Sequence, residues 1–401
     1  MADTLEDTSV EEVGTTPAIS ADEYERATGE ALARTLDLAT WESNTRLAES
    51  LAKLEAEVAA AAKDESALVH SIRADLFPRI GKRPGAPVHA GVYQATTSHI
   101  EAAQQTLLFN GLTEACDATS VLLDTLALKV VQIGVGLVSY SGKDMTLSHR
   151  IYRRDMRVKQ AGLVEEAIEI LERRRLENEG GSGGAVSDML RRAIMTYAER
   201  AVLVERATAP WRMGHGNPLA YELLTGSGLA ALIDPSLVIL DRLLEQKKFA
   251  FVTSDTNRRE LLTIGNALKP LECAIVDDVA PYLDKVLGGH YTGEWVAKKG
   301  GLTEFAATYG HKVLIGVYRV SGHSPPRMFY AHADHVHEAA LLLMADSILQ
   351  EHRGFPMLID IADTLCGNYF GSETLMRPAQ AAFAELGEPY RYLPERSTRN
   401  N

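Results

Sequence analysis

The sequence has little of what would place it among disulfide-bonded, zinc-binding or membrane proteins. Its 401 residues include only three cysteines, Cys116, Cys273 and Cys366, which are far apart and form no Cys-x-x-Cys pair. A disulfide framework or a cysteine zinc site is therefore not encoded, and we expect core thiols. No uninterrupted apolar run of about 18 residues occurs, and residues 1–6 lack the basic start of a signal peptide. We therefore expect a cytoplasmic protein without a membrane-spanning segment.

Two common catalytic signatures are also missing. The glycine-rich run at residues 180–184 has no following Lys-Ser/Thr pair and no Gly-x-Gly-x-x-Gly context, so it does not resemble a phosphate-binding loop. We interpret residues 178–186 as a flexible joint. No His-Glu-x-x-His motif is present, which leaves a zincin peptidase without support.

Basic residues are absent from the first 25 positions, which carry eight of the chain's 54 acids. Without these eight, 46 acids face 41 bases, and the net charge changes from −13 to −5. On such a mildly acidic body, a cluster of bases can dominate the potential within a screening length of about 10 Å. The bases in question are Arg150, Arg153, Arg154, Arg157 and Lys159. They are a candidate contact for nucleic-acid phosphates, with a merely solvated surface as the alternative.

The composition predicts three successive regions. Residues 1–21 are rich in acidic and hydroxyl side chains, which indicates a disordered acidic tail. Residues 22–84 carry leucines at spacings of three and four, which predicts a helical arm for dimerisation or partner docking. Prolines and glycines from Pro78 to Pro87 end the helical pattern. Residues 85–399 then form the main folded domain.

Strand-like and helical patterns alternate in this domain. The run at 130–140 is apolar and β-branched, which suits a strand buried on both faces, and 148–158 can return beside it. Helical patterns follow at 161–178 and from Ser187, a possible cap, to Glu205. Further strand-like runs, separated by helices, lie at 221–225, 249–253, 273–277, 313–320 and 327–332. The prediction is an α/β fold with a mixed sheet flanked by helices.

A candidate metal-binding carboxylate is Asp117, which lies among small residues in the segment 114–120 before the predicted sheet. Mg²⁺ and Mn²⁺ are held by carboxylate oxygens and keep open positions for phosphate and water. Two such ions about 4 Å apart can activate water and stabilise the leaving oxygen in phosphodiester hydrolysis. The alternative is an ordinary turn or cap residue.

Several segments resemble the NurA family of nucleases, in the same order, over about residues 85–399. They are 91–94, 107–111, 114–120, 131–140 and 149–158. The resemblance implies an RNase H-like core, a divalent metal ion and a HerA-type hexameric ATPase as partner. The segment from Asp117 to Ser120 looks like the family's Asp-Gly-Ser motif, with Ala118 at the glycine position. In the helix at 187–206, Glu199, or else Glu205, looks like the family's helical glutamate.

Two departures from the family pattern affect the implied site. Residues 221–227 fall where the family has an apolar strand ending in Asp-Gly-Ser, and Thr225 replaces the aspartate. Residues 354–363 resemble the family's Pro-x-Leu-x-x-Ala-His segment, with Asp363 at the histidine position. The implied catalytic and metal-binding set is Asp117, Glu199 and Asp363, with Asp360 as a nearby alternative. Cap or surface roles for Asp360 and Asp363 stay equally open.

The resemblance therefore implies a DNA nuclease that uses Mn²⁺ or Mg²⁺, with Arg150–Lys159 guiding the strand. A homodimer acting with a HerA-type DNA translocase, in DNA end processing or anti-phage defence, is expected. The rival hypothesis is a catalytically degraded subunit that binds DNA or serves as a scaffold for the ATPase. A third is an unrelated α/β enzyme acting on a phosphorylated small molecule.

Two further groups have less specific patterns. The histidine-rich segment 331–338 has the density of a transition-metal site, but a helix start capped by Asp334 is favoured there. The C-terminal segment 390–399 mixes aromatics and arginines, which suits either nucleic acid or docking on protein.

Overall fold

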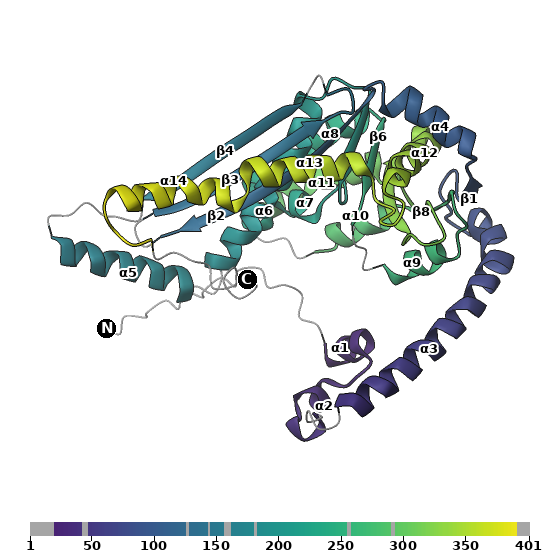
Figure 1. Cartoon of the computed structure of the whole chain (residues 1–401), viewed down its shortest axis with the longest axis horizontal. Coiled ribbons are helices and arrows are strands. Elements are labelled where there is room, and N and C mark those ends of the chain that lie inside the picture. The colour runs from purple at the N-terminus through teal and green to yellow at the C-terminus, as the bar shows by residue number, and fades with distance from the viewer. Residues whose placement is uncertain are drawn as a thin grey trace, which may run out of the picture. The chain divides into compact units, whose positions relative to one another are not determined.

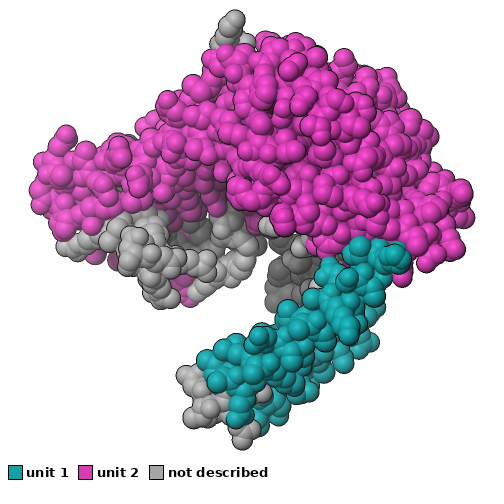
Figure 2. Space-filling model, turned by 45° about the vertical axis from the view of Figure 1, so that its right-hand side comes forward, with its two compact units in different colours: residues 1–70 teal, residues 71–401 magenta. Residues whose placement is uncertain are grey.

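The computed structural model describes residues 20–41, 47–125, 128–142, 145–155, 162–179, 183–254, 258–289 and 293–390. Figure 2 shows the two compact units of the chain, Met1–His70 and Ser71–Asn401. Residues 1–19 of the predicted acidic tail and 391–399 of the C-terminal segment lie outside the described residues. So do residues 180–182, at the centre of the predicted joint.

The N-terminal region is helical, as the leucine spacing predicts. Its helices are α1 (Ala21–Thr28), α2 (Leu32–Leu36) and α3 (Leu47–Ser71). The start of α1 is fixed by a capping box, in which Ser20 and Glu23 each accept a hydrogen bond from the other's backbone N–H. Residues 71–84, which we predicted as the end of the arm, belong to the second unit. Dimerisation or docking by the arm stays a prediction.

The second unit is built on one sheet of nine strands in the order β1-β7-β8-β9-β6-β5-β2-β3-β4. The strands are β1 (Gly91–Gln94), β2 (Thr113–Asp124), β3 (Leu128–Val138), β4 (Thr146–Asp155), β5 (Trp211–His215), β6 (Phe249–Val252), β7 (Glu272–Asp278), β8 (Val313–Arg319) and β9 (Arg327–His332). Strands β5 and β6 run parallel to β2, whereas all other neighbours are antiparallel. The predicted mixed sheet is confirmed.

Half of this sheet has the RNase H-like arrangement. The three antiparallel strands β2, β3 and β4 are followed by the parallel strands β5 and β6, and their spatial order is β4-β3-β2-β5-β6. The connection from β4 to β5 must cross over the sheet, because β5 runs parallel to β2 on its other side. Helices α5 (Leu163–Glu179) and α6 (Gly183–Glu205) lie in this connection, and α6 packs against β2.

Helices cover both faces of the sheet (Figure 1). The helices are α4 (Thr97–Ala103), α5 (Leu163–Glu179), α6 (Gly183–Glu205), α7 (Tyr221–Thr225), α8 (Ile233–Glu245), α9 (Arg259–Asn266), α10 (Ala280–Leu287), α11 (Glu294–Tyr309), α12 (Val336–Ser347), α13 (Met357–Phe370) and α14 (Ser372–Glu385). One core lies between the sheet and α6–α11, and a second lies between the sheet and α4, α12 and α13. In Figure 1, α13 and α14 cross one face of β2–β4.

Alternation along the strands decides which core each residue joins. Cys116 packs in the core under α6, and its neighbour Ala115 packs in the core under α13. Asp117, one residue further, therefore belongs to the α13 face. No helix among the described residues is long and apolar enough to cross a membrane.

Three local expectations are corrected. Residues 221–225 form helix α7, and not a strand. Asp117 lies inside the twelve-residue strand β2, and not before the sheet. Helix α6 begins at Gly183, so Ser187 lies within the helix and does not cap it.

Candidate active site

The candidate site lies beside the part of β2 that extends beyond its pairing with β5. Strand β5 pairs with β2 only from Thr113 to Cys116, whereas β3 stays paired along the other side as far as Asp124. Asp117, opposite Gly136 of β3, is the first residue of β2 beyond the paired part of β5. Asp117 therefore lies in the part of β2 that is not paired with β5, and α6 and α13 pack against β2 from opposite faces.

Two cysteines hold these helices against β2. On one face, the thiol of Cys116 donates to the carbonyl oxygen of Glu199 in α6 at 3.7 Å. On the other, the thiol of Cys366 in α13 donates to the carbonyl oxygen of Asp117 at 3.1 Å. Both thiols are buried and free, as expected for core cysteines. They anchor one helix on each side of Asp117.

Helix α13 approaches the sheet closely because β3 has glycines beneath it. A Cβ atom at Gly136 would lie 3.0 Å from Sγ of Cys366, and one at Gly134 would lie 2.0–2.5 Å from side-chain atoms of Phe370. A larger residue at either position would push the helix outward. Asp363, one turn before Cys366 on α13, is exposed and adds its negative charge to the field at Asp117.

The Asp117 carboxyl group is buried without a basic partner. Burial raises its pKa first, and the charge of Glu199 raises it further, to about 8. A hydrogen bond of 2.8 Å from the Ala118 N–H and the more distant charge of Arg200 only partly oppose this. Among the described residues, no Lys or Arg lies within salt-bridge distance of Asp117.

Glu199 is equally buried but shares its charge with Arg200. Burial raises the pKa of Glu199 to about 7, against the charge and hydrogen bond of Arg200, and the carboxylate of Glu222 on α7 adds to the rise. The Arg200 Nη1 atom lies 2.9 Å from Glu199 Oε2. The charge of Glu199 thus acts on Asp117, while one Glu199 oxygen already accepts a hydrogen bond from Arg200; a role of Glu199 in the site stays a prediction.

Arg200 also fixes the loop after β5. Its guanidinium donates to the carbonyl oxygens of His215 at 3.2 Å and Asn217 at 2.9 Å, and it lies over the ring of Phe251 at 4.5 Å. The Arg200 side chain is 2% exposed, so these contacts replace nearly all of its water. The loop, α6 and β5 are therefore held together at the point where β5 ends.

The other predicted site residues lie in different surroundings. Asp360 accepts hydrogen bonds from Gln350, at 2.6 Å, and from Arg353, with which it forms an ion pair. Glu205, the less favoured alternative to Glu199, is paired with Arg242 at the surface. The hydroxyl of Thr225 donates to a carbonyl within its own helix at 2.8 Å. To bind a metal ion, each of these side chains would first have to lose the hydrogen bond or ion pair that it makes here.

The basic cluster lies on the edge strand β4. Arg150, Arg153 and Arg154 are exposed, and Arg150 lies over the ring of Tyr152 at 5.5 Å. Arg157 and Lys159 lie outside the described residues. Because β4 is the outermost strand, the exposed Arg150 and Arg153 can be reached by a ligand along the edge of the sheet.

Sequence reasoning missed three residues of this region, Arg200, Glu222 and His215. A basic residue directly after Glu199 gave a weak signal for the first, because consecutive helical residues do not usually face one another. The other two depend on where β5 and α7 lie. The pairing of β5 with β2 ends at Cys116 and Gly214, so Asp117 and His215 each directly follow the last paired residue of their strand.

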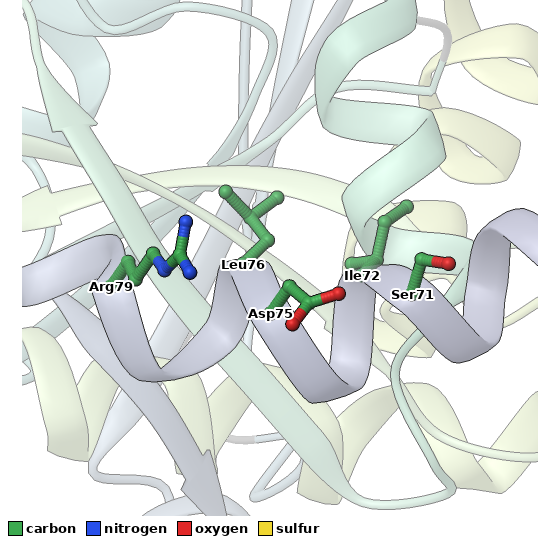
Figure 3. A pocket seen from close by; sticks show the side chains of 5 residues that line it. All are labelled: Ser71, Ile72, Asp75, Leu76 and Arg79. Atoms are coloured by element: carbon green, nitrogen blue, oxygen red, sulfur yellow. The ribbon is translucent and has the colours of Figure 1, made fainter.

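The other two candidate regions are separate from these acids. In the histidine-rich segment, Asp334 binds Lys247 at 2.7 Å and does not cap α12, which begins after His335. A hollow of about 290 Å³ lies along one helical segment in Figure 3, lined by Ser71, Ile72, Asp75, Leu76 and Arg79. None of the acids of the candidate site lines it.

The acids of this site match the ligand chemistry of a hard divalent cation. Among the described residues, no three His, Cys, Asp or Glu side chains are already drawn together around a metal position. Asp117 and Glu199 nevertheless share a buried field that disfavours the charged form of both. A bound cation would relieve this repulsion, and oxygen donors suit Mg²⁺ or Mn²⁺. The donor set therefore fits such an ion, although its atoms are not closed around one.

Comparison with known proteins gives only distant similarity. No family model and no curated protein matches the chain. The NurA nuclease from Sulfolobus solfataricus is similar in structure, with 8% identity and a TM-score of 0.45 over 87% of this chain and 99% of that chain. A structure of NurA bound to dAMP and manganese gives 10% identity and a TM-score of 0.38, over 80% and 93%. The roles of residues in this chain rest on its own geometry.

Proposed function

We propose that this chain is a metal-dependent deoxyribonuclease, in which Asp117, Glu199 and Asp363 hold Mn²⁺ or Mg²⁺. The observation that carries the proposal is the pair of buried acids Asp117 and Glu199, both with raised pKa values, of which Asp117 makes no ion pair among the described residues. Strongly raised acid pKa values in such a position are typical of functional sites. The metal ion, when bound, would supply an activated water and charge stabilisation at the scissile phosphate.

The chain's own residues have distinct roles in this proposal. Asp117 would hold the ion in its deprotonated form, so its carboxyl group would have to give up a proton. Arg200 keeps one oxygen of Glu199 oriented and leaves the other for the ion. Asp363, on the exposed side of α13, closes the site from the solvent side. The β4 arginines Arg150 and Arg153 would contact DNA phosphates along the sheet edge.

The resemblance of short sequence motifs to the NurA family supports a proposal about the partner and the cellular role of this chain. On that basis we propose a cytoplasmic homodimer that works with a HerA-type hexameric ATPase in DNA end processing or anti-phage defence. These assignments rest on the motifs alone, and the acids of the site do not depend on them.

The proposal is tested by cleavage of end-labelled linear DNA by the purified chain with Mn²⁺, Mg²⁺ or EDTA. Metal-dependent cutting should be lost in Asp117→Asn and in Asp363→Asn. The matched control is Asp360→Asn, three residues away on the same helix, whose carboxylate is bound to Arg353. Cutting that survives in Asp117→Asn would exclude this site as the catalytic centre.

A second candidate function is a DNA-binding or scaffolding subunit without catalysis. The ion pair between Glu199 and Arg200 favours it, because an arginine already neutralises one of the acids that a metal ion would need. Titration calorimetry with Mn²⁺ separates the two functions. Binding in the wild type that is lost in Asp117→Asn supports the nuclease, whereas absence of binding with retained DNA affinity supports the scaffold.

A further inference from the structure

The outer edge of the sheet carries an aromatic ring close to the end of α13. His149 of β4 pairs with Gly134 of β3, and its ring stacks on that of Phe370 with centroids 5.4 Å apart and planes 29° from parallel. Phe370 is buried and lies directly over Gly134, where a Cβ atom would clash with its side chain. His149 itself is exposed, so a flat ligand can reach its ring while Phe370 holds that ring in place.

The same face of β4 continues with an apolar and a basic side chain. Because side chains alternate along a strand, Ile151 and Arg153 lie on the face of His149, about 7 Å and about 14 Å from it along the strand. Ile151 is 44% exposed, and Arg153 is also exposed. A ring, an apolar side chain and a cation in one open row can bind a nucleic-acid strand through stacking, apolar contact and attraction of phosphate.

Helix α13 connects this row to the acids of the candidate site. Gly367 and Phe370 follow Asp363 by four and seven residues, so all three lie on one flank of the helix. Two helical turns separate Asp363 from Phe370, which is about 10 Å along the helix axis. The charge of Asp363 acts on Asp117, and Phe370 contacts His149. This flank of α13 therefore leads from the proposed catalytic acids to the ring of His149.

Gly367, in the middle of this flank, is a glycine that packing does not require. It lies in the interior of α13, where glycine is less favourable than any other residue except proline. Side chains of α13 fill the space over Gly134 and Gly136, whereas among the described residues no atom outside the helix backbone lies within 4 Å of a Cβ at Gly367. The missing side chain leaves an open surface next to Asp363, where a ligand can approach the helix backbone closely.

We propose that the ring of His149 is a stacking site for an unpaired nucleobase of the bound DNA strand, whose backbone passes over Gly367 from Asp363. This inference rests on the proposed function and adds a base-binding site to it. The base is unpaired or at a strand end, because bases inside a duplex are stacked on one another and offer no free face. Stacking accepts any base, since every base has a flat π-face, and Arg153 contacts a phosphate of the same strand.

The test is binding of fluorescent single strands to the purified full chain in EDTA, so that cleavage does not affect the result. Two strands of about 15 nucleotides carry the same phosphates, but one has thymine at every position and the other is abasic throughout. Fluorescence anisotropy should show tighter binding of the thymine strand. His149→Ala should weaken that binding by about 5- to 100-fold and leave the affinity for the abasic strand unchanged. His149→Phe, which keeps a ring, should restore the preference for thymine.

Further variants separate the contribution of bases from that of phosphates. Arg153→Gln should weaken binding of both strands by a similar factor, because it removes a phosphate contact. Gly367→Leu fills the open surface of α13 with a side chain, which should weaken binding of both strands without destabilising the helix. His352→Ala, at an exposed histidine outside the row, should change neither affinity. Thermal unfolding of each variant shows that it is folded.

The outcomes separate this inference from the proposed function. Equal affinity of the wild type for the two strands, or an equal loss for both in His149→Ala, would overturn the stacking site, and metal-dependent cleavage lost in Asp117→Asn would leave the nuclease standing. Base-dependent binding that His149→Ala removes, in a chain without metal-dependent cleavage, would support the stacking site and overturn the nuclease. Absence of both cleavage and binding of either strand at low salt would overturn both proposals.

Discussion

Two acids at different places in the same sheet show how burial and pairing act separately. Asp117 in β2 is 7% exposed and Glu272 in β7 is 6% exposed. Burial acts to raise the pKa of Glu272 too, but two hydrogen bonds from Arg73, at 2.6 and 3.0 Å, outweigh it. The pKa of Glu272 is therefore held below its usual value, whereas that of Asp117 is raised to about 8.

Ion pairs stabilise the buried acid of β7, whereas the buried acid of β2 remains strained. Near β7, acids and bases are arranged in pairs, and Arg83 with Asp277 repeats the pattern of Arg73 with Glu272. Near β2, the charge of Glu199 raises the pKa of Asp117, and Arg200 forms an ion pair with Glu199 alone. Strain of this kind persists when it serves function, at some cost in stability.

The comparison is tested most strongly by removing each acid in turn. Asp117→Asn should reduce metal-dependent cleavage by at least about 100-fold, since loss of one charge-stabilising group has that effect in other enzymes. The same change should stabilise the metal-free fold near neutral pH by about 1 kcal/mol, because the buried Asp117 carboxyl group must take up a proton on folding and the amide need not, while the amide oxygen still accepts from Ala118. Cleavage assays and denaturant unfolding measure the two effects.

Glu272→Gln is the matched control for that substitution. It should destabilise the fold by about 1–3 kcal/mol, because Arg73 loses its charged partner, and leave cleavage by the folded protein unchanged. If both substitutions destabilise the chain equally, the contrast between the two ends of the sheet is wrong.

The second prediction concerns the close approach of α13, which brings Asp363 to the site. Gly134→Ala would place a Cβ atom within 2.0–2.5 Å of the Phe370 side chain and should cost about 1–3 kcal/mol through overpacking. By moving α13, it should also lower cleavage in the fraction that stays folded. Gly367→Ala, on the open side of the same helix, has no atom within 4 Å of the new Cβ and should stabilise slightly. Equal stability of the two variants would argue against tight packing of α13.

The sequence was sufficient for those parts of the fold whose signal is local. Strands β3 and β6 to β9 follow apolar, β-branched runs, and the predicted ranges match them within a few residues. Strand β2 was missed because the segment 114–120 mixes small and polar residues. Strand β5 was missed because its five residues include a glycine, an arginine and a histidine. In both strands, burial comes from neighbours far away in the chain.

The site was predictable only in part for the same reason. Asp117, Glu199 and Asp363 were named from short motifs, and electrostatic contact between Asp117 and each of the other two is a finding of the structure. The position of His215 depends on a strand register between residues about 100 apart, and no local pattern contains it. The hydrogen bonds that Arg200 donates likewise depend on the position of the loop after β5.

The third prediction uses pH to sharpen the contrast between the two acids. The folded chain raises the pKa of Asp117 from 3.8 to about 8, so between these values it holds a proton that the unfolded chain has lost. The stability gained from this proton is full below the unfolded value and is lost as pH rises through 8. Because a divalent ion binds the deprotonated form, stabilisation by Mn²⁺ should grow from pH 5 to pH 8.5. Thermal unfolding with and without Mn²⁺ measures this gap.

Asp117→Asn is the control for the pH series, because it removes the titrating group. Its metal-free stability should vary less with pH over that range than the wild type's. A gap between metal-bound and metal-free unfolding that is constant from pH 5 to pH 8.5 would contradict the raised pKa of Asp117.

The smallest expected effect is on the salt dependence of DNA binding, and it concerns the arginines at the two ends of the sheet. Near β7, Arg73 and Arg83 are paired with acids, whereas on β4 Arg150 and Arg153 face solvent and are available to an external anion. Each phosphate contact on a DNA duplex adds about 0.9 to the slope of log affinity against log salt, so Arg153→Gln should lower the slope by about that amount. Fluorescence anisotropy of a labelled duplex, titrated at several salt concentrations, measures it. Arg377→Gln, on α14 and paired with Glu373, should leave the slope unchanged, and an equal decrease in both variants would mean that β4 contributes only net charge.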